Sequence, residues 1–185
     1  MTRHTRGFTL VELVTVVAVM GVLAAIAFPG MRNYMDKQRL VSQVRAISEL
    51  AQLARGEAIK HSSSAALNIS KTVSMTINPG TPWSVGLSNG TAACSTIANC
   101  VINQAGTDVG YRLTATECST CTMSSPAAQA VITFDTRGLV MTTGAADELV
   151  TLNSPLGKNL SLSVNRLGRI SLCTTGNSVG GYPAC

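Results

Sequence analysis

The stretch Gly7-Phe8-Thr9-Leu10-Val11-Glu12-Leu13 opens an apolar run that continues to Phe28. The 21 residues from Phe8 to Phe28 contain a single ionisable side chain, Glu12. At a rise of about 1.5 Å per residue, a helix of this length crosses the hydrocarbon core of a bilayer, which needs about 20 residues. The run therefore predicts a transmembrane helix over residues 8–28.

Glu12 is the unusual residue of this run. A carboxylate at the centre of a membrane helix costs roughly 2.5 to 3.5 kcal/mol on insertion scales, and somewhat less near the helix end. We therefore expect Glu12 to have a partner, and an amine is the nearest suitable cation. An ordinary single-pass anchor with a stray glutamate would explain neither the placement of the acid nor the Gly7-Phe8 junction.

The leader before the run sets the orientation. Arg3, His4 and Arg6 occur there with no acid, so the positive-inside bias places residues 1–7 in the cytoplasm and the chain beyond Phe28 outside. A secretory signal would instead be cleaved after its apolar region, at small residues. Here the basic leader ends in Gly7, directly before the apolar run.

This junction resembles the processing site of type IV prepilins and type II secretion pseudopilins. The resemblance implies that a prepilin peptidase cuts between Gly7 and Phe8 and methylates the new amine of Phe8. Glu12 would then be the fifth mature residue and would pair with the amine of Phe8 or of a neighbouring subunit. The protein would sit in the bacterial inner membrane with its head in the periplasm before it joins a filament.

The helix is predicted to continue beyond the membrane to about Lys60, a length of about 80 Å from Phe8. An apolar face at spacings of three and four residues supports this: Leu40, Val44, Ile47, Ala51, Ala54 and Ala58. Pro29 and Gly30 interrupt the helix, and we expect a kink or a locally melted segment there.

Residues 61–185 supply enough chain for one head domain. Few residues are charged, 12% of the chain, and residues that favour strands and turns are abundant, so the head is predicted to be mainly β and the fold α+β, with antiparallel strands. Alternating apolar residues mark five strands: around 73–77, 83–87, 130–134, 160–164 and 170–172. A further strand is expected over Leu139–Thr142. Residues 88–129 look like an insertion stapled by disulfides, with at most one strand near Val109–Thr114.

All six cysteines follow the membrane segment, in an oxidising compartment where an even count indicates disulfides. Fifteen connectivities are possible for six cysteines. Proximity in the chain favours three pairs: Cys94 with Cys100, Cys118 with Cys121, and Cys173 with Cys185. A redox role for Cys118 and Cys121 and a four-cysteine zinc site are less favoured alternatives, so we expect no metal and no cofactor.

Four later stretches sharpen the resemblance. They are Leu50–Lys60, the strand at Trp83, the hairpin Ile132–Gly138 and the stretch Gly168–Cys173, and together they look like the GspH/FimT group of minor pilins and pseudopilins. The resemblance implies a long helix packed on a β domain of two sheets. It also implies a minor pilin of a type IV pilus that binds other pilin subunits, with a pseudopilin of a type II secretion system as the alternative.

An enzymatic role is not indicated. The chain contains no Gly-x-Ser-x-Gly elbow, no phosphate-binding Gly-x-x-x-x-Gly-Lys loop and no His-Glu-x-x-His pair. We therefore expect no catalytic residues and no small-molecule substrate.

The C-terminal hairpin is the candidate DNA-binding site. Lys158, Arg166 and Arg169 follow the last acid of the chain, Glu148. In the FimT branch a glycine-arginine-x-arginine motif here is associated with DNA binding; Gly168 and Arg169 match it, but Ser171 replaces the second arginine. Removing the leader with Arg3 and Arg6 lowers the formal net charge from +5 to +3, so global charge is weak evidence for DNA. The alternative is three solvated surface charges.

Overall fold

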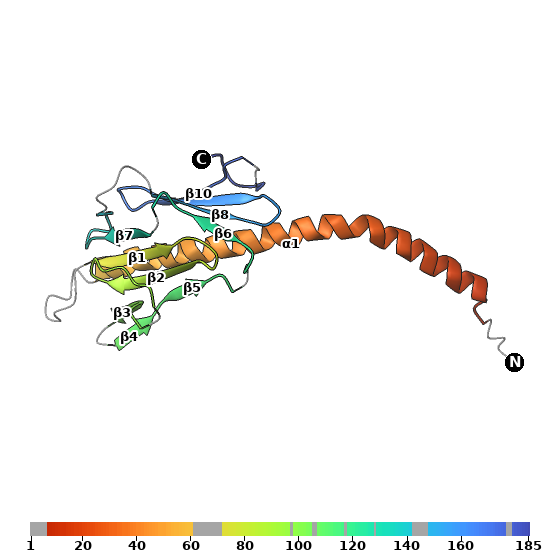
Figure 1. Cartoon of the computed structure of the whole chain (residues 1–185), viewed down its shortest axis with the longest axis horizontal. Helices are drawn as coiled ribbons and strands as arrows, with labels where there is room; N and C mark the ends of the chain where they lie inside the picture. The colour runs from red at the N-terminus through yellow and green to blue at the C-terminus, as the bar shows by residue number, and fades with distance from the viewer. Residues whose placement is uncertain are drawn as a thin grey trace, which may run out of the picture. The chain divides into compact units, whose positions relative to one another are not determined.

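A computed structural model of the chain describes residues 7–60, 72–96, 98–104, 107–116, 118–127, 129–141, 148–176 and 179–185. The chain forms two compact units, Met1–Asp36 and Lys37–Cys185. The second unit contains the head and the second half of the long helix (Figure 1). The observed architecture is α+β, as predicted.

The helix α1 spans Leu10–Lys60, which confirms a helix that ends at about Lys60. Pro29 and Gly30 both lie within it, so the melted segment expected at these residues is not present. A proline removes one backbone N–H and need not end a helix whose other hydrogen bonds persist. A kink at this point stays a prediction.

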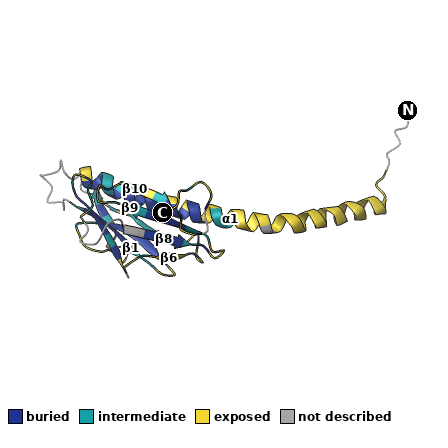
Figure 2. Ribbon diagram, turned by 90° about the horizontal axis from the view of Figure 1, so that it is seen from above, coloured by how far each residue is buried: buried dark blue, intermediate teal, exposed yellow. Residues whose placement is uncertain are grey.

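The first part of α1 is exposed along its apolar length (yellow in Figure 2). Among the described residues, α1 is the one helix long and apolar enough to cross a membrane. Its apolar side chains point in all directions, with exposed fractions of 78% at Leu10, 59% at Val19 and 72% at Ile26. This part of the helix has no apolar partner within the described chain.

The second part of α1 buries one face, as its periodicity predicted. All six residues of the predicted stripe are buried, and Val41 and Leu50 join them. They belong to a single core cluster with residues of the β-strands. The head domain therefore includes the helix from Lys37 onward as a structural element.

One sheet has the strand order β5-β2-β1-β7, with every neighbouring pair antiparallel. Its strands are β1 (Val73–Asn78), β2 (Ser84–Asn89), β5 (Arg112–Thr114) and β7 (Ala130–Phe134). Met75 pairs with Leu87 on one side and with Ile132 on the other, and all three are fully buried. The predicted strands at 73–77, 83–87 and 130–134 are confirmed.

The other four-stranded sheet has the order β10-β9-β8-β6 and is also antiparallel. Its strands are β6 (Thr122–Ser124), β8 (Glu148–Asn153), β9 (Asn159–Val164) and β10 (Ile170–Cys173). The predicted strands at 160–164 and 170–172 are confirmed, but β8 was not predicted. The alternation of Val150 and Leu152, both buried, was the available signal.

The prediction of at most one strand within residues 88–129 is wrong. This segment contains β3 (Val101–Gln104), β4 (Thr107–Gly110), β5 and β6. β3 and β4 form a separate ribbon, whereas β5 and β6 each complete one edge of a main sheet. Strands of three or four residues obtain their conformation from the sheet edge that they join, and local sequence carries little of that information.

The strand expected over Leu139–Thr142 is reduced to one bridge, between Phe134 and Val140. Thr142 lies outside the described residues. The N–H of Val140 donates to the carbonyl of Arg166 at 3.1 Å, in the turn after β9. This segment thus joins two hairpin turns in place of continuing a strand.

Candidate functional site

Thr9 and Glu12 form a capping box at the start of α1. The backbone N–H and the hydroxyl of Thr9 donate to the Glu12 carboxylate at 2.9 and 3.0 Å. In return, the N–H of Glu12 donates to the Thr9 hydroxyl at 3.3 Å. Thr9 precedes the first helical residue and Glu12 is the third, which is the spacing at which such reciprocal bonds form. Glu12 therefore has a partner within its own chain.

This local partner for Glu12 was missed, although the Thr-x-x-Glu pattern was legible in the sequence. Gly7 and Phe8 precede the cap, and both are exposed; Phe8 is 88% exposed. The leader residues before Gly7 lie outside the described residues. The junction is thus open to solvent, while cleavage there and methylation of Phe8 stay predictions.

The six cysteines form the three predicted disulfides: Cys94–Cys100, Cys118–Cys121 and Cys173–Cys185. The first of them packs against β2, where a Cβ on Gly86 would overlap both sulfur atoms. This contact explains a glycine in the middle of a buried strand. The Cys94–Cys100 disulfide therefore packs on the sheet as well as closing a loop of the 88–129 segment.

The Cys173–Cys185 disulfide closes a C-terminal strap, which we define as the described residues 174–176 and 179–185. Val179 in the strap is 1% exposed and belongs to the core cluster. Lys37 of α1 donates to the carbonyl of Gly180 at 3.0 Å, and the Arg45 Nε donates to the Tyr182 hydroxyl at 3.2 Å. The strap therefore holds the beginning of the buried part of α1.

At the other end of the head, Arg55 of α1 joins two hairpin turns. Its Nε donates to the carbonyl of Gly138 at 3.1 Å, and its Nη2 donates to the carbonyl of Leu167 at 3.4 Å. Both acceptors are backbone oxygens, so these bonds leave the positive charge of the guanidinium unneutralised. No role for Arg55 was predicted from the sequence, because no neighbouring residue indicates that two distant turns meet beside it.

The two turns approach each other so closely that glycine is required. Gly138 and Gly168 have φ values of +75° and +71°. A Cβ on Gly168 would lie 2.1 Å from the carbonyl oxygen of Gly138, and a Cβ on Gly138 would lie 2.9 Å from the Arg55 Nε. The packing of the two turns thus explains the glycine at position 168 without DNA binding, although Gly168 is part of the motif associated with that activity.

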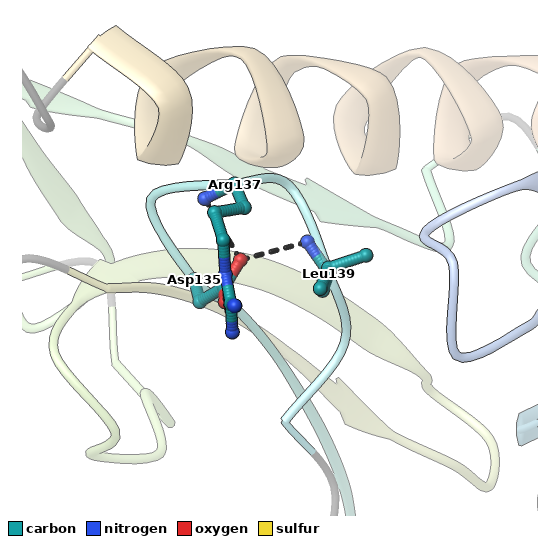
Figure 3. Close-up of polar contacts among 3 residues, drawn as sticks. All are labelled: Asp135, Arg137 and Leu139. Carbon is teal, nitrogen blue, oxygen red and sulfur yellow. Dashed lines mark hydrogen bonds and ion pairs between the residues drawn. The ribbon is translucent and has the colours of Figure 1, made fainter.

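Asp135 organises the first of these turns, which lies beside α1 in Figure 3. Its carboxylate accepts bonds from the backbone N–H groups of Arg137 and Leu139 at 2.9 and 2.8 Å, and from the Arg137 guanidinium at 2.9 Å. Burial of the carboxyl favours its neutral form, but the donors from Leu139 and Arg137 outweigh this and lower the pKa of Asp135.

The three candidate DNA-binding cations do not form one cluster. Lys158 precedes β9, whereas Arg166 and Arg169 lie in and after the turn that follows it. A strand of six residues spans about 20 Å. Arg166 and Arg169 are exposed, and neither side chain has a hydrogen bond or ion pair with another described residue. The patch expected from the sequence is therefore reduced to two arginines, of which Arg169 lines the same groove as Arg55.

Arg169 and Arg55 line a groove of about 410 Å³ between the end of α1 and the start of β10. We call it the α1–β10 groove; its other lining residues are Gln52, Gly56, Ile59, Gly168 and Ile170. No carboxylate is among them. The groove is therefore suited to an anionic group.

Comparison with known families identifies two matches. Residues 2–28 match the prokaryotic N-terminal methylation motif, and residues 43–168 match the family described as type II transport protein GspH. The first match includes the Gly7-Phe8 junction and Glu12. The second covers more than half of the chain, from the buried part of α1 to the turn at Gly168.

Curated relatives match over the N-terminal region. The chain is 46% identical over 46 residues to fimbrial protein Q of Moraxella bovis, covering 25% of this chain and 27% of that protein. It is 46% identical over 48 residues to the type IV major fimbrial protein FimA of Dichelobacter nodosus, covering 26% and 29%. It is 42% identical over 50 residues to type II secretion system core protein G of Dickeya chrysanthemi, covering 25% and 33%. The chain thus spans a third or less of these relatives.

Among solved structures, the type IV minor pilin FimU of Pseudomonas aeruginosa is similar with a TM-score of 0.47 and 17% sequence identity. The similarity covers 75% of this chain and 91% of that one.

Proposed function

This chain belongs to the type II transport protein GspH family and carries the N-terminal methylation motif of type IV pilins, and on that premise we propose that it is a minor pilin of a type IV pilus. It is held in the inner membrane by residues 8–28, with its head in the periplasm. It then enters the filament or its tip by packing that helix among other pilin subunits.

The observation that carries this proposal is the exposed apolar helix. Residues 8–28 are predominantly apolar, their one ionisable side chain is Glu12, and all of them are exposed. A helix that is apolar all round needs a membrane or other helices around it. The methylation motif and the family match favour a helix that lies first in the membrane and later among the helices of other pilin subunits.

The capping box suggests how Glu12 serves both states. Before assembly, the Thr9 N–H and hydroxyl satisfy the carboxylate within the chain. Cleavage after Gly7 by a prepilin peptidase would create a charged amine on Phe8, one residue before Thr9. We infer that Glu12 then pairs with that amine or with the amine of a neighbouring subunit, because a charge pair in hydrocarbon is favoured over an isolated charge.

Replacement of Glu12 by alanine tests the proposal. We expect the head to fold normally and incorporation into pili to be blocked or slowed, measured by immunoblotting sheared pili against whole cells. Thr15→Ala is the matched control, since Thr15 also lies in the first turns and bonds only to the backbone carbonyl of Glu12. Normal incorporation of the Glu12→Ala protein would refute the assembly role of Glu12.

A pseudopilin of a type II secretion system is the second candidate. It is favoured by the name of the matching family and by the similarity to type II secretion core protein G. Deletion of the chain's gene discriminates the two: loss of surface pili with normal protein secretion supports the pilus, and the reverse result supports secretion.

DNA binding during natural transformation is a further candidate activity, favoured by the exposed arginines Arg166 and Arg169. Since Lys158 lies beyond β9, it does not contribute, but Arg55 lines the same groove as Arg169 and can act as the third cation. The slope of log affinity against log salt should then be no steeper than about −2.7, at roughly −0.9 per phosphate. The test is an electrophoretic shift with the full chain in a non-ionic detergent, comparing wild type, an Arg166 and Arg169 double alanine variant, and Lys158→Ala as control.

A further inference from the structure

The α1–β10 groove has a charge that the protein itself does not balance. Arg55 uses two of its N–H groups on backbone carbonyls, and the Arg169 side chain has no partner among the described residues. Two acids near the groove are paired with other groups, whereas the exposed Glu49 of α1 is not among the lining residues. Asp135 is bound by Arg137 and by two backbone N–H groups, and the carboxylate of Glu57, 4% exposed, is paired with Lys60 at 2.7 Å. The groove therefore offers two guanidinium groups to an outside anion.

The groove is also partly apolar. Ile59 and Ile170 are among its lining residues, and Ile59 is 43% exposed. Leu167 follows Arg166 at the adjoining turn and is 68% exposed. Arginines next to exposed aliphatic side chains are typical of protein interfaces, in which Arg is enriched and Lys depleted.

This composition discriminates between two kinds of anionic partner. A nucleic acid would use the guanidiniums through its phosphates, but the groove lining contains no aromatic side chain on which a base could stack. An acidic protein segment would use both parts of the groove, with carboxylates on the arginines and apolar side chains on the isoleucines and Leu167. The observations favour the protein segment.

The site is also held in shape before any partner arrives. Arg55 bonds to both turns, the N–H of Val140 bonds to Arg166, and the close approach of Gly138 and Gly168 leaves no space between the turns. A pre-organised surface loses less conformational entropy on binding than a mobile one.

We propose that the α1–β10 groove, together with Leu167, docks an acidic, partly apolar segment from the head of another pilin subunit. Carboxylates of that segment pair with Arg169 and with the unused N–H groups of Arg55, in the geometry that guanidinium and carboxylate favour. This inference rests on the proposed role as a pilin, because assembly is what brings another head against this end of the domain.

The first test measures binding of synthetic peptides to the full chain in a non-ionic detergent. One probe peptide carries glutamates flanking leucines, and a second has the leucines replaced by serines. We expect the leucine peptide to bind more tightly. We expect Arg169→Gln to weaken its binding about three- to tenfold, which is the range for losing one ordinary hydrogen bond. Lys158→Gln removes the same charge beyond β9 and should leave binding unchanged.

Three results would overturn the inference. The first is that the leucine peptide does not bind although the protein unfolds cooperatively, and the second is that Arg169→Gln and Lys158→Gln lower its affinity equally. The third is that duplex DNA binds more tightly than the leucine peptide and depends on Arg169 in the same way. The last result would assign the groove to nucleic acid. Incorporation of wild-type protein into sheared pili is scored in parallel, so that failure of the docking site is distinguished from failure of the pilin assignment.

Discussion

The two parts of α1 belong to one helix but differ in what covers them. Up to Asp36 its apolar side chains are exposed, whereas from Lys37 to Lys60 one apolar face is buried under the head (Figure 2). The difference lies in the side-chain pattern: the first part is apolar all round and the second is apolar on one stripe. A stripe finds its partner within the chain, while an all-round apolar surface needs partners from outside.

This contrast separates stability from assembly. Substitutions in the buried stripe, or in the elements that hold it, should lower the free energy of unfolding of the head. Substitutions in the exposed part should leave that free energy unchanged and affect insertion or assembly. Trp83 is the single tryptophan, is 1% exposed and lies in the head, so its fluorescence reports unfolding of the head alone.

The largest effect is expected for Ile47→Ala in the buried stripe. Ile47 is 2% exposed, and truncating a buried isoleucine typically costs about 2 to 5 kcal/mol of unfolding free energy. Val19→Ala, at a position 59% exposed in the first part of α1, should change head stability by less than about 0.5 kcal/mol. Denaturant unfolding followed by Trp83 fluorescence measures both. Equal losses would mean that the two parts of the helix are not energetically distinct.

The next effect concerns the strap that holds the start of the buried stripe. Replacing Cys173 and Cys185 by serine should cost about 2 to 3 kcal/mol in the chain-entropy model. It should also speed hydrogen exchange in α1 between Lys37 and Arg45, since both residues bond to the strap.

Replacing Cys118 and Cys121 by serine is the matched control for the strap. It removes a disulfide with a sequence separation of 3 in place of 12, so the entropic loss is smaller. Exchange in α1 should not change in this variant. Unchanged exchange in the Cys173 and Cys185 variant as well would show that the strap does not hold the helix.

A pH-dependent effect is expected at Asp135, which shapes the turn bonded to Arg55. Its pKa is lowered in the folded protein, so its contribution to stability is present above its ordinary value of about 3.9 and is lost as the pH falls through the lower folded value. The melting temperature measured between pH 6 and about pH 2 should therefore fall more steeply with decreasing pH for wild type than for Asp135→Asn. Parallel curves would contradict the role of this carboxylate.

The smallest effect is expected at the exposed end of α1. Thr9→Ala removes the N-cap and should weaken the first turn by about 1 kcal/mol without altering head stability. Faster hydrogen exchange at Glu12 and Leu13 measures it, because the N–H groups of these residues bond to Thr9. Thr9→Ser keeps the hydroxyl and should behave like wild type; an effect of the same size in this variant would exclude hydrogen bonding as the cause.

Much of the fold was predictable because its signals are local. The length of the apolar run, the stripe from Leu40 to Ala58 and the alternation in five strands each depend on residues close together in the chain. The disulfide pairing followed from proximity for the same reason, since each bridge closes a short loop. The capping box at Thr9 was equally local and could have been recognised.

The failures have the opposite character. β5 and β6 are strands because each completes the edge of a sheet built from distant segments. The residues around β5 and β6 do not indicate which sheet edge each strand joins. Lys158 was grouped with Arg166 and Arg169 by their order in the chain, although a strand holds them at opposite ends. Arg55 joined the candidate site only because the turns at Gly138 and Gly168 meet beside it.

The order of amino acids alone is enough to place an apolar, acid-bearing helix at the start of this protein, to divide that helix into an all-round apolar part and a striped part, and to pair its cysteines. Periodicity and short loops are properties of neighbouring residues, so no knowledge of the fold is needed to recognise them. Which charges share a surface was decided only by tertiary packing. Tertiary packing brings together Arg55 and Arg169, 114 positions apart in the chain, because the turns at Gly138 and Gly168 pack against each other beside α1.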